Sequence, residues 1–493
     1  MTAAGTCMAG RSIATARLLS GTVPLTVSRN ATLHVADGLI TAVDHDSRSA
    51  PECFPDTLIV PALANAHDHG RGLKTLAYGA IDTAVEAWVP ATYTIPPLDP
   101  YLVAALAFAR MARAGITSIV HCHLSAGGAS LLDAPGAVAR AARDVGVRIA
   151  FVVPLRDRHR LGYGADDAVL AHMAADDVAA IRAQWLKPIA PIAAQLDLVE
   201  AIAAAHESPH FNVQYGPVGM EWCSDALLQA VAGRAAQSRR RVHMHLLESK
   251  YQRQWADQHY PEGPVRRLAG IGLLSDRLTV AHGTWLRPDE SELMAQHGVT
   301  VSINTSSNLR LKSGIAPLQA IKAARLRFAI GLDALALDDD DDILRELRLT
   351  HLLHSGTGFD RHLTREDVFC AGSRAGACAV CGPSPAGMLA AGAPADFIVL
   401  DYAALAADQH PDLDDPFRTF FMRAQQRHID SVYSAGRKIV ERGRVLGLDQ
   451  AALERDMSTQ LARAAPAIAA QQALLARFQQ GLERFYRSGG HRA

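Results

Sequence analysis

Short apolar runs alternate with helix-like stretches through the middle of the chain. Every run except the last two leads into a loop and then a segment with a helical pattern, such as residues 224–237 with Ser224 in the N-cap position. Eight βα repeats in one domain are the pattern of a (β/α)8 barrel. The eight runs are Leu58–Ala62, Ile116–His121, Arg148–Pro154, Phe211–Tyr215, Arg241–His245, Leu278–His282, Val299–Ile303 and Phe328–Leu332.

The two ends of the chain show a strand-like pattern instead. Short apolar segments between residues 25 and 43 are separated by polar residues and glycine, and residues 396–401 and 428–440 have a similar character. We therefore expect strands from both ends to pair, with the barrel inserted between them. The prediction is an α/β protein with a small β-sandwich domain from 1–58 and 391–447, a TIM-like barrel over 59–390, and a C-terminal helical segment over 448–493.

Composition and charge narrow the class of protein. The chain has 493 residues, of which 49% are hydrophobic and 20% charged, as in soluble globular proteins. A net charge of −1 argues against nucleic acid as the main partner, because phosphate binding needs a basic face. No apolar run approaches the roughly 20 residues of a membrane span. The 7 scattered cysteines indicate no disulfide framework, so we expect a cytoplasmic protein. With nucleic acid and membrane excluded as partners, the expected partner is a small molecule.

Histidines and acids stand where the predicted barrel strands end, which is where barrel enzymes carry their chemistry. The first run leads to His67 and His69, which share one face because residues two apart on a strand point the same way. The other candidates are His245 and Glu248 after the fifth run, His282 after the sixth, and Asp333 after the eighth. Imidazole nitrogens with a carboxylate suit Zn²⁺ or Fe²⁺, so the set predicts a metal-dependent hydrolytic site.

Five motifs occur in order along the chain. They are PALANAHDHG at 61–70, HLLE at 245–248, AHG at 281–283, NTSSNLRLKSGIAP at 304–317 and GLD at 331–333. With these motifs the sequence resembles the amidohydrolase superfamily, in the branch of cytosine and guanine deaminases and triazine hydrolases. Two positions depart from the family pattern: Asp68 stands where the family usually has Thr or Ser, and Leu332 where it has Thr or Ser. Neither departure removes a ligand.

The resemblance implies a role for each residue at the strand ends. It implies one divalent ion, zinc or iron, held by His67, His69, His245 and Asp333. It further implies that Asp333 takes a proton from the attacking water, that Glu248 moves protons to the substrate, and that His282 orients or polarises the reacting carbon. Residues 211–219 contain no lysine of the kind that binuclear members carboxylate, which favours a single ion. The family resemblance also predicts a homodimer or larger homo-oligomer.

Aromatic and polar residues after the predicted strands are candidate substrate contacts. Trp88 and Trp285 could stack on a flat ring. Arg156 could meet a carboxylate or a ring carbonyl, or pair with Asp157 instead. Gln214 and Asn308 complete this set.

Three further features keep two interpretations each. His121 and His123 repeat the spacing of the first histidine pair. They either form a second ligand pair or, as we favour, one lines the pocket and the other packs. Asp338–Asp342 either cap a helix that begins near Ile343 or select a cationic substrate. Cys378 and Cys381 form a CxxC pair with no second pair, and packing is the favoured interpretation. His243 shares a face with His245, and we expect it to orient a ligand.

The predicted function is a metal-dependent deaminase that attacks a C–NH2 or C=NH carbon of a nitrogen heterocycle and releases ammonia. The same site could instead hydrolyse a cyclic or linear amide, or a substituted triazine that loses an amine or a halide. A more distant alternative is a metal-free binding scaffold. That alternative predicts lost ligands, whereas every ligand position here carries a ligand residue.

Overall fold

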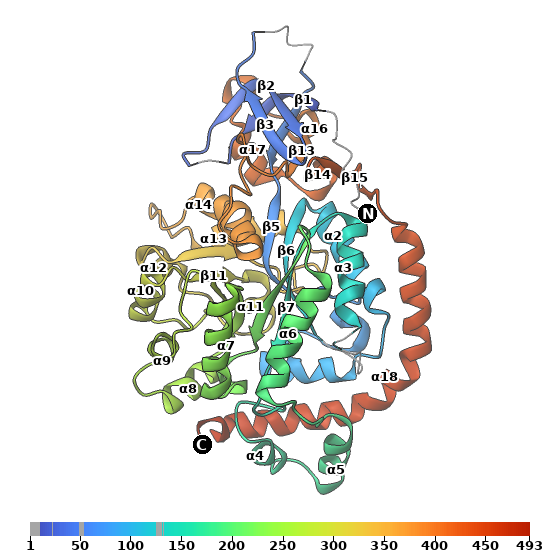
Figure 1. The fold of residues 1–493 in the computed structure, drawn as a ribbon, viewed down its shortest axis with the longest axis vertical. Helices are drawn as coiled ribbons and strands as arrows, with labels where there is room; N and C mark the ends of the chain where they lie inside the picture. The colour runs from blue at the N-terminus through green and yellow to red at the C-terminus, as the bar shows by residue number, and fades with distance from the viewer. Residues whose placement is uncertain (1–9, 22, 49–53, 125–130, 132) are drawn as a thin grey trace.

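Two sheets of 8 strands each organise the chain in the computed structural model. The structure describes residues 10–21, 23–48, 54–124, 131 and 133–493, so parts of the predicted segment 1–58 lie outside the described residues. One sheet is the barrel, and the other forms a smaller domain beside the barrel's N-terminal end (Figure 1). Within the described residues, no helix is both long and apolar enough to cross a membrane.

The barrel consists of parallel strands in chain order, with the last strand packed against the first. The strands are β5 (Leu63–Asp68), β6 (Ile116–Cys122), β7 (Arg148–Leu155), β8 (Phe211–Pro217), β9 (Val242–Leu246), β10 (Leu278–His282), β11 (Thr300–Ile303) and β12 (Arg327–Ile330). Their inward and outward side chains are mostly buried because helices cover the outside, so they appear as continuous apolar runs in the sequence. The predicted (β/α)8 barrel is confirmed.

The first strand predicted for the barrel does not belong to the barrel. The run Leu58–Ala62 forms β4 (Thr57–Pro61), which pairs with strands of the small sheet, and the barrel begins only at β5. The apolar run continues from Leu58 to Ala64 with no polar residue to mark the passage between sheets. Periodicity therefore could not separate the two strands.

Helices follow every barrel strand, including the last two, for which the sequence showed no clear helical pattern. On the barrel exterior and at its mouth lie α1 (Val85–Trp88), α2 (Pro100–Arg113), α3 (Ala134–Val145), α4 (Asp166–Leu170), α5 (Ala175–Gln184), α6 (Ile192–His206), α7 (Asp225–Ser238), α8 (Lys250–His259), α9 (Pro264–Gly270), α10 (Pro288–Gln296), α11 (Thr305–Arg310), α12 (Leu318–Ala323) and α13 (Ile343–His354). Helix α7 begins as predicted, because the Ser224 side chain accepts a hydrogen bond from the Leu227 backbone N–H.

The small sheet brings the two ends of the chain together. Its order is β16-β15-β14-β13-β4-β1-β2-β3, so the late strand β13 lies directly beside the early strand β4. Its strands are β1 (Arg11–Leu19), β2 (Val27–Ala36), β3 (Leu39–Asp44), β4, β13 (Phe397–Asp401), β14 (Ile429–Ser434), β15 (Arg437–Glu441) and β16 (Arg444–Val445). The predicted β domain from both chain ends is confirmed. Its strands form one continuous hydrogen-bonded sheet.

The segment after the barrel packs under its N-terminal end. Helices α14 (Arg365–Cys370) and α15 (Gly376–Cys381) are joined by a π-helical turn, and α15 lies against β5, β6 and β7. Cys378 and Cys381 are free cysteines on α15, and neither belongs to a potential metal-binding group among the described residues. Two short helices of the small domain, α16 (Tyr402–Leu405) and α17 (Pro416–Arg423), complete this part.

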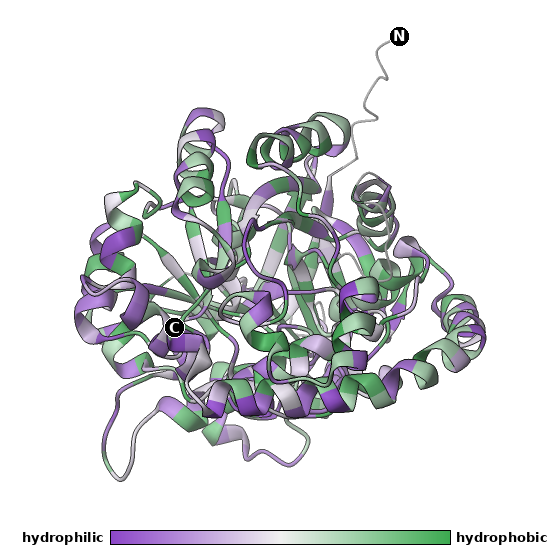
Figure 2. Cartoon of the chain, turned by 90° about the horizontal axis from the view of Figure 1, so that it is seen from below, coloured by the Kyte–Doolittle hydropathy of each residue, from purple (hydrophilic) through white to green (hydrophobic). Residues whose placement is uncertain are grey.

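The predicted C-terminal helical segment is one long helix, α18 (Gln450–Arg487), which contains Pro466 in its interior. It runs along one side of the barrel and then bends across the barrel's other end (Figure 1). Hydrophobic and hydrophilic residues alternate along it, as a surface helix requires (Figure 2). Its second half packs on α4 and on α1 at the C-terminal mouth of the barrel.

Candidate metal centre and active site

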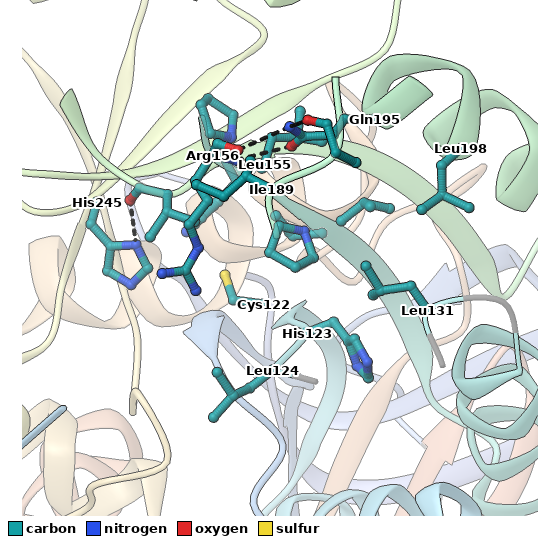
Figure 3. Close-up of a pocket in the computed structure, with 18 of the residues that line it drawn as sticks. Cys122, His123, Leu124, Leu131, Leu155, Arg156, Ile189, Gln195, Leu198 and His245 are labelled. Carbon is teal, nitrogen blue, oxygen red and sulfur yellow. Dashed lines mark hydrogen bonds between the residues drawn. The ribbon is translucent and has the colours of Figure 1, made fainter. Parts of the chain in front are cut away.

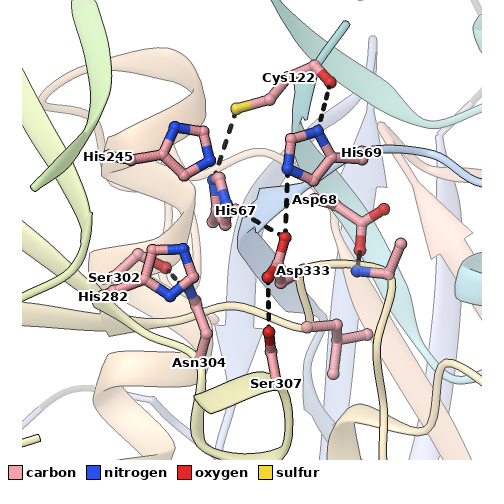
Figure 4. A network of polar contacts seen from close by, with 12 residues as sticks. His67, Asp68, His69, Cys122, His245, His282, Ser302, Asn304, Ser307 and Asp333 are labelled. Carbon is pink, nitrogen blue, oxygen red and sulfur yellow. Dashed lines mark hydrogen bonds and ion pairs between the residues drawn. The ribbon is translucent and has the colours of Figure 1, made fainter. Parts of the chain in front are cut away.

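The strand-end residues converge at the C-terminal mouth of the barrel (Figure 4). Ligand atoms of His67, His69 and His245 lie within 4.8 Å of one another, and so do those of His67, His282 and Asp333. His67 lies near the end of β5 and His69 directly follows it. His245 lies near the end of β9, His282 ends β10, and Asp333 follows β12. The barrel thus joins residues that are up to 266 positions apart in the sequence, from His67 to Asp333.

Asp333 is the centre of this cluster. Its Oδ1 atom lies 3.3 Å from His67 Nε2 and 3.2 Å from His69 Nε2. Its Oδ2 atom accepts a hydrogen bond of 2.6 Å from Ser307 Oγ. Burial opposes ionisation, but the close approach of the two histidines outweighs burial and holds the pKa of Asp333 well below its usual range. Asp333 is therefore a carboxylate, the form that binds a cation or accepts a proton.

Backbone carbonyls fix which ring nitrogen of His69 and of His245 faces the site. His69 Nδ1 lies 3.0 Å from the Cys122 carbonyl oxygen, and His245 Nδ1 lies 2.9 Å from that of Val218. Because a carbonyl only accepts, both Nδ1 atoms carry a proton, and both Nε2 atoms are directed into the site. Burial lowers the pKa of His245 to about 3, so its ring is neutral.

His243 occupies the position predicted for an orienting residue. Its Nε2 atom lies 2.9 Å from His67 Nδ1, and the two rings stack with centroids 5.0 Å apart. Burial lowers the pKa of His67 and of His243 well below the usual value, so one ring donates and the other accepts. His67 Nε2 is left facing Asp333. The donor set of neutral imidazoles and one carboxylate fits a divalent metal ion.

The backbone is strained where it delivers these side chains. Leu247, His282 and Asp333 have φ values of 51°, 73° and 54°, in the left-handed region that side chains other than glycine rarely adopt. Strain of this kind persists where the surrounding structure fixes it, and it clusters at functional sites. Each strand here turns sharply at its end, which directs the functional side chain into the mouth.

Glu248 and His282 form the second part of the site. Glu248 Oε2 lies 3.8 Å from His282 Nε2, and Glu248 Oε1 accepts a hydrogen bond of 3.3 Å from Ser313 Oγ. Burial raises the pKa of Glu248 above its ordinary value, an effect that the nearby His282 partly offsets and Asp333 reinforces. The protonated form of this carboxyl group is therefore more favourable than it would be in an exposed glutamate. A protonated carboxyl group can act as a proton donor.

Two further buried carboxyl groups, not anticipated from the sequence, lie behind Glu248. Glu86 on α1 accepts a hydrogen bond from Ser249 Oγ, and burial raises its pKa to about 7. Glu221, in a short 3-10 turn, has its pKa raised by burial to about 8. The charge of Glu248 contributes to both increases in pKa. No spacing in the sequence relates these residues to the strand ends, so only the fold reveals them.

Two cavities that share lining residues adjoin the cluster. The smaller, about 130 Å³, is lined by His69, Glu248, His282 and Asp333 together with Trp88. The larger, about 390 Å³, is predominantly apolar and is shown in Figure 3. Both are lined by His69, Leu124, Arg156, Arg160, Val218 and His245.

Two of the predicted substrate contacts line these cavities. Trp88 is buried and lines the smaller one. Arg156 lines both, and its backbone is held by Gln195, which accepts from its N–H at 3.1 Å and donates to its carbonyl at 2.9 Å. Asp157 binds Ser224 instead, so the predicted alternative of an ion pair with Arg156 is not formed.

The structure directs the other three predicted contacts elsewhere. Gln214 is fully buried inside the barrel, and its Nε2 atom donates to the Ala379 carbonyl at 3.1 Å. Trp285 lies outside both cavities and donates from Nε1 to the Ser313 carbonyl at 2.8 Å. Asn308 Oδ1 accepts from His282 Nδ1 at 2.9 Å, so it orients that ring. Strand position placed these residues near the mouth but could not tell which way each side chain points.

The open alternatives resolve in part. His123 lines the larger cavity, and His121 and His123 together line a small apolar one beside it. Asp342 caps α13 by accepting from the Leu344 and Arg345 N–H groups. Asp341 is buried and pairs with Lys74 and Arg110. The acidic run therefore caps and anchors the helix, as the simpler interpretation predicted.

Comparison with known proteins agrees with this geometry. The fold is that of a zinc-bound adenosine deaminase from Xanthomonas campestris, with a TM-score of 0.75 at 21% identity over 93% of this chain and 98% of that one. The chain belongs to the amidohydrolase family, whose model matches residues 58–439. The predicted resemblance is confirmed, and with it a hydrolase that acts on carbon–nitrogen bonds.

Two curated relatives are named as deaminases. A 5'-deoxyadenosine deaminase of Methanosarcina barkeri is 25% identical over 437 residues, which cover 87% of this chain and 92% of the relative. A 5-methylthioadenosine/S-adenosylhomocysteine deaminase of Bacillus cereus is 30% identical over 248 residues. That second match covers 50% of this chain and only 56% of the relative.

Proposed function

We propose that the protein is a metal-dependent aminohydrolase that removes an amino group, as ammonia, from a nitrogen heterocycle. The observation that carries this proposal is the meeting of a ligand set, His67, His69, His245 and Asp333, with a separate buried acid, Glu248, beside one cavity. The ligand set suits one zinc ion, with iron as the alternative metal. The acid supplies the proton transfer that loss of an amine requires.

The relatives support a more specific substrate class. Both are named for deamination of adenosine derivatives, and we propose an aminated purine-type ring with a substituent for this chain. The smaller cavity has room for little more than a ring, whereas the larger cavity offers about 390 Å³ for the rest of the molecule. Trp88 is placed to pack on the ring, and Arg156 to bind a polar or anionic group beyond it.

The residues then have distinct tasks. A bound divalent ion would supply the nucleophile, because it lowers the pKa of a coordinated water from 15.7 to about 7. Asp333, held ionised, takes the proton of the attacking water. Glu248 gives its proton to the ring nitrogen next to the attacked carbon, and His282 stabilises the charge that develops there. The attacked carbon becomes tetrahedral. The proton held by Asp333 then passes to the amino group, which leaves as ammonia, while the new hydroxyl group returns its proton to Glu248 and the carbon becomes a carbonyl.

The test is ammonia release by the zinc-loaded protein with a panel of substrates. The panel contains adenosine, 5'-deoxyadenosine, 5-methylthioadenosine, S-adenosylhomocysteine, free adenine, guanine and cytosine. We expect turnover of purine nucleosides, with kcat about 10²- to 10⁴-fold lower in the Glu248→Gln variant. Turnover of the bases alone would refute the proposed substituent. No ammonia from any member, with zinc bound, would refute the deaminase and favour the alternative of amide or triazine hydrolysis.

The oligomeric state and location stay predictions. We propose a homodimer or larger homo-oligomer on the family resemblance, and a location in the cytoplasm on the scattered cysteines. Light scattering of the purified protein measures the first. A monomer that turns over substrate at full rate would refute it.

A further inference from the structure

The end of the chain packs on the helix that begins just after Glu248. Tyr486, in the last turn of α18, has its ring centroid 4.8 Å from that of Tyr251, in the first turn of α8. His491 lies 5.0 Å from the same Tyr251 ring and 2.9 Å, from Nε2, to Gln254 Oε1. The C-terminal segment therefore packs against the N-terminal part of α8, which is the end nearest the active site.

A chain of buried hydrogen bonds continues from this contact to Glu248. Tyr486 Oη accepts from the Tyr163 backbone N–H at 3.0 Å. Tyr163 Oη accepts from Gln252 Nε2 at 3.3 Å, and Gln252 Oε1 accepts from the Glu248 backbone N–H at 2.6 Å. All four residues are at least nine-tenths buried. Because water cannot replace a lost partner there, each bond restricts the next.

A second connection reaches the same place through α1. Gln479 of α18 donates from Nε2 to the Ala87 carbonyl at 2.8 Å. The neighbouring Glu86 accepts from Ser249 Oγ, and Ser249 Oγ in turn accepts from the Gln252 N–H at 3.2 Å. Ser249 follows Glu248 directly in the chain. Helix α18 thus contacts both of the elements that hold the backbone at residues 248–249.

We propose that helix α18 positions the proton-transfer acid Glu248, with Tyr486 and Gln252 as the positioning residues. The role of Glu248 as the acid rests on the proposed function. The physical reason is that proton transfer needs the donor within hydrogen-bond reach of the ring nitrogen, so a displacement of about 1 Å can cost about 100-fold in rate. The strand β9 fixes His245 but ends at Leu246, two residues before Glu248, so the barrel itself does not hold the acid.

The molecule offers a matched control on the same helix. Arg477 of α18 makes a paired contact with Asp177 of α5, with N···O distances of 2.8–3.0 Å. Arg477→Ala loosens α18 from the barrel mouth without touching α1, α8 or the chain of bonds to Glu248. It separates a positioning effect from general loosening of the helix.

The experiment compares Tyr486→Phe, Gln252→Met and Arg477→Ala in the full-length, zinc-loaded protein. We expect Tyr486→Phe and Gln252→Met to lower kcat by about ten- to a hundredfold while KM changes little, because the ring contacts stay in place. We also expect the high-pH limb of the kcat profile to move to lower pH. Burial raises the pKa of Glu248, and a loosened, hydrated Glu248 loses its proton earlier. Arg477→Ala should match the unchanged protein in kcat and in the pH limb.

Hydrogen–deuterium exchange of residues 247–256 provides a readout that needs no activity. Faster exchange there in Tyr486→Phe, but not in Arg477→Ala, is expected. Unchanged exchange, or faster exchange with an unchanged kcat and pH limb, would overturn the proposal. If the unaltered protein releases ammonia from no substrate, the proposed function fails, and the exchange result still decides whether α18 restrains this segment. Should Tyr486→Phe fail to fold, Gln252→Met carries the same comparison.

Discussion

The metal-ligand cluster and the surroundings of Glu248 lie side by side at the barrel mouth, yet they are held by different parts of the molecule. The ligands His67 and His245 lie on barrel strands. His69 directly follows its strand, and Asp333 follows the last strand by three residues. Glu248 lies beyond its strand. Its backbone N–H donates to Gln252, its carboxyl group accepts from Ser313, and Ser249 follows it directly in the chain. Segments outside the barrel strands support these three residues. The ligands therefore depend on the barrel, and the acid depends on additions to it.

The largest expected effect comes from removing a ligand. His245→Ala takes one of the converging nitrogens from the site, and we expect zinc binding and turnover to fall to background together. Elemental analysis and an ammonia assay on the same sample measure both. His297→Ala, which deletes an exposed histidine at the end of α10, should retain zinc and rate. A variant that keeps full activity without His245 would contradict the ligand assignment.

The next effect separates the acid from the ligands. Glu248→Gln keeps the size and burial of the side chain but removes its proton, so we expect zinc to bind normally while kcat falls about 10²- to 10⁴-fold. Zinc content, melting temperature and kcat are the measurements. Turnover at the unaltered rate in the zinc-loaded variant would show that another group transfers the proton.

A smaller effect concerns the residue that orients a ligand. His243→Leu removes the partner of His67 Nδ1, and we expect metal affinity to fall about 10- to 100-fold while kcat at saturating zinc changes little. Competition with a zinc chelator measures the affinity. An unchanged affinity would mean that the barrel strand alone orients His67.

The smallest effect is a change in how stability depends on pH. The folded pKa of Glu86 is raised to about 7, above its unfolded value, so between about pH 4.5 and 7 the folded state keeps a proton that the unfolded state has lost. Stability contributed by this group is present below that window and lost as pH rises through it, by at most about 1.4 kcal/mol per pH unit. In Glu86→Gln the free energy of unfolding should fall less between pH 5 and 7, as urea titrations would show. Equal slopes in both proteins would contradict the raised pKa.

The sequence predicted the barrel and the ligand residues because both follow local rules. Parallel strands covered by helices appear as apolar runs, and the strand end places His67 and His69 on one face. The passage from β4 to β5 was misjudged because two strands of different sheets share one apolar run. The sequence could not show that Gln214 bonds to Ala379, Trp285 to Ser313 and Asn308 to His282, because side-chain direction depends on the packing of elements distant in the chain. Their contacts with substrate stay predictions.

By itself, the sequence determined the α/β barrel, the β domain from both chain ends and the order of His67, His69, His245, Glu248, His282 and Asp333 along the strands. Periodicity and strand position carry that information. Only the tertiary structure decided that Glu86 and Glu221 lie near Glu248. It also decided that Asn308 orients His282 and that α18 packs against α8. These contacts join segments up to several hundred residues apart, and their existence depends on how packed elements meet, which no local pattern records.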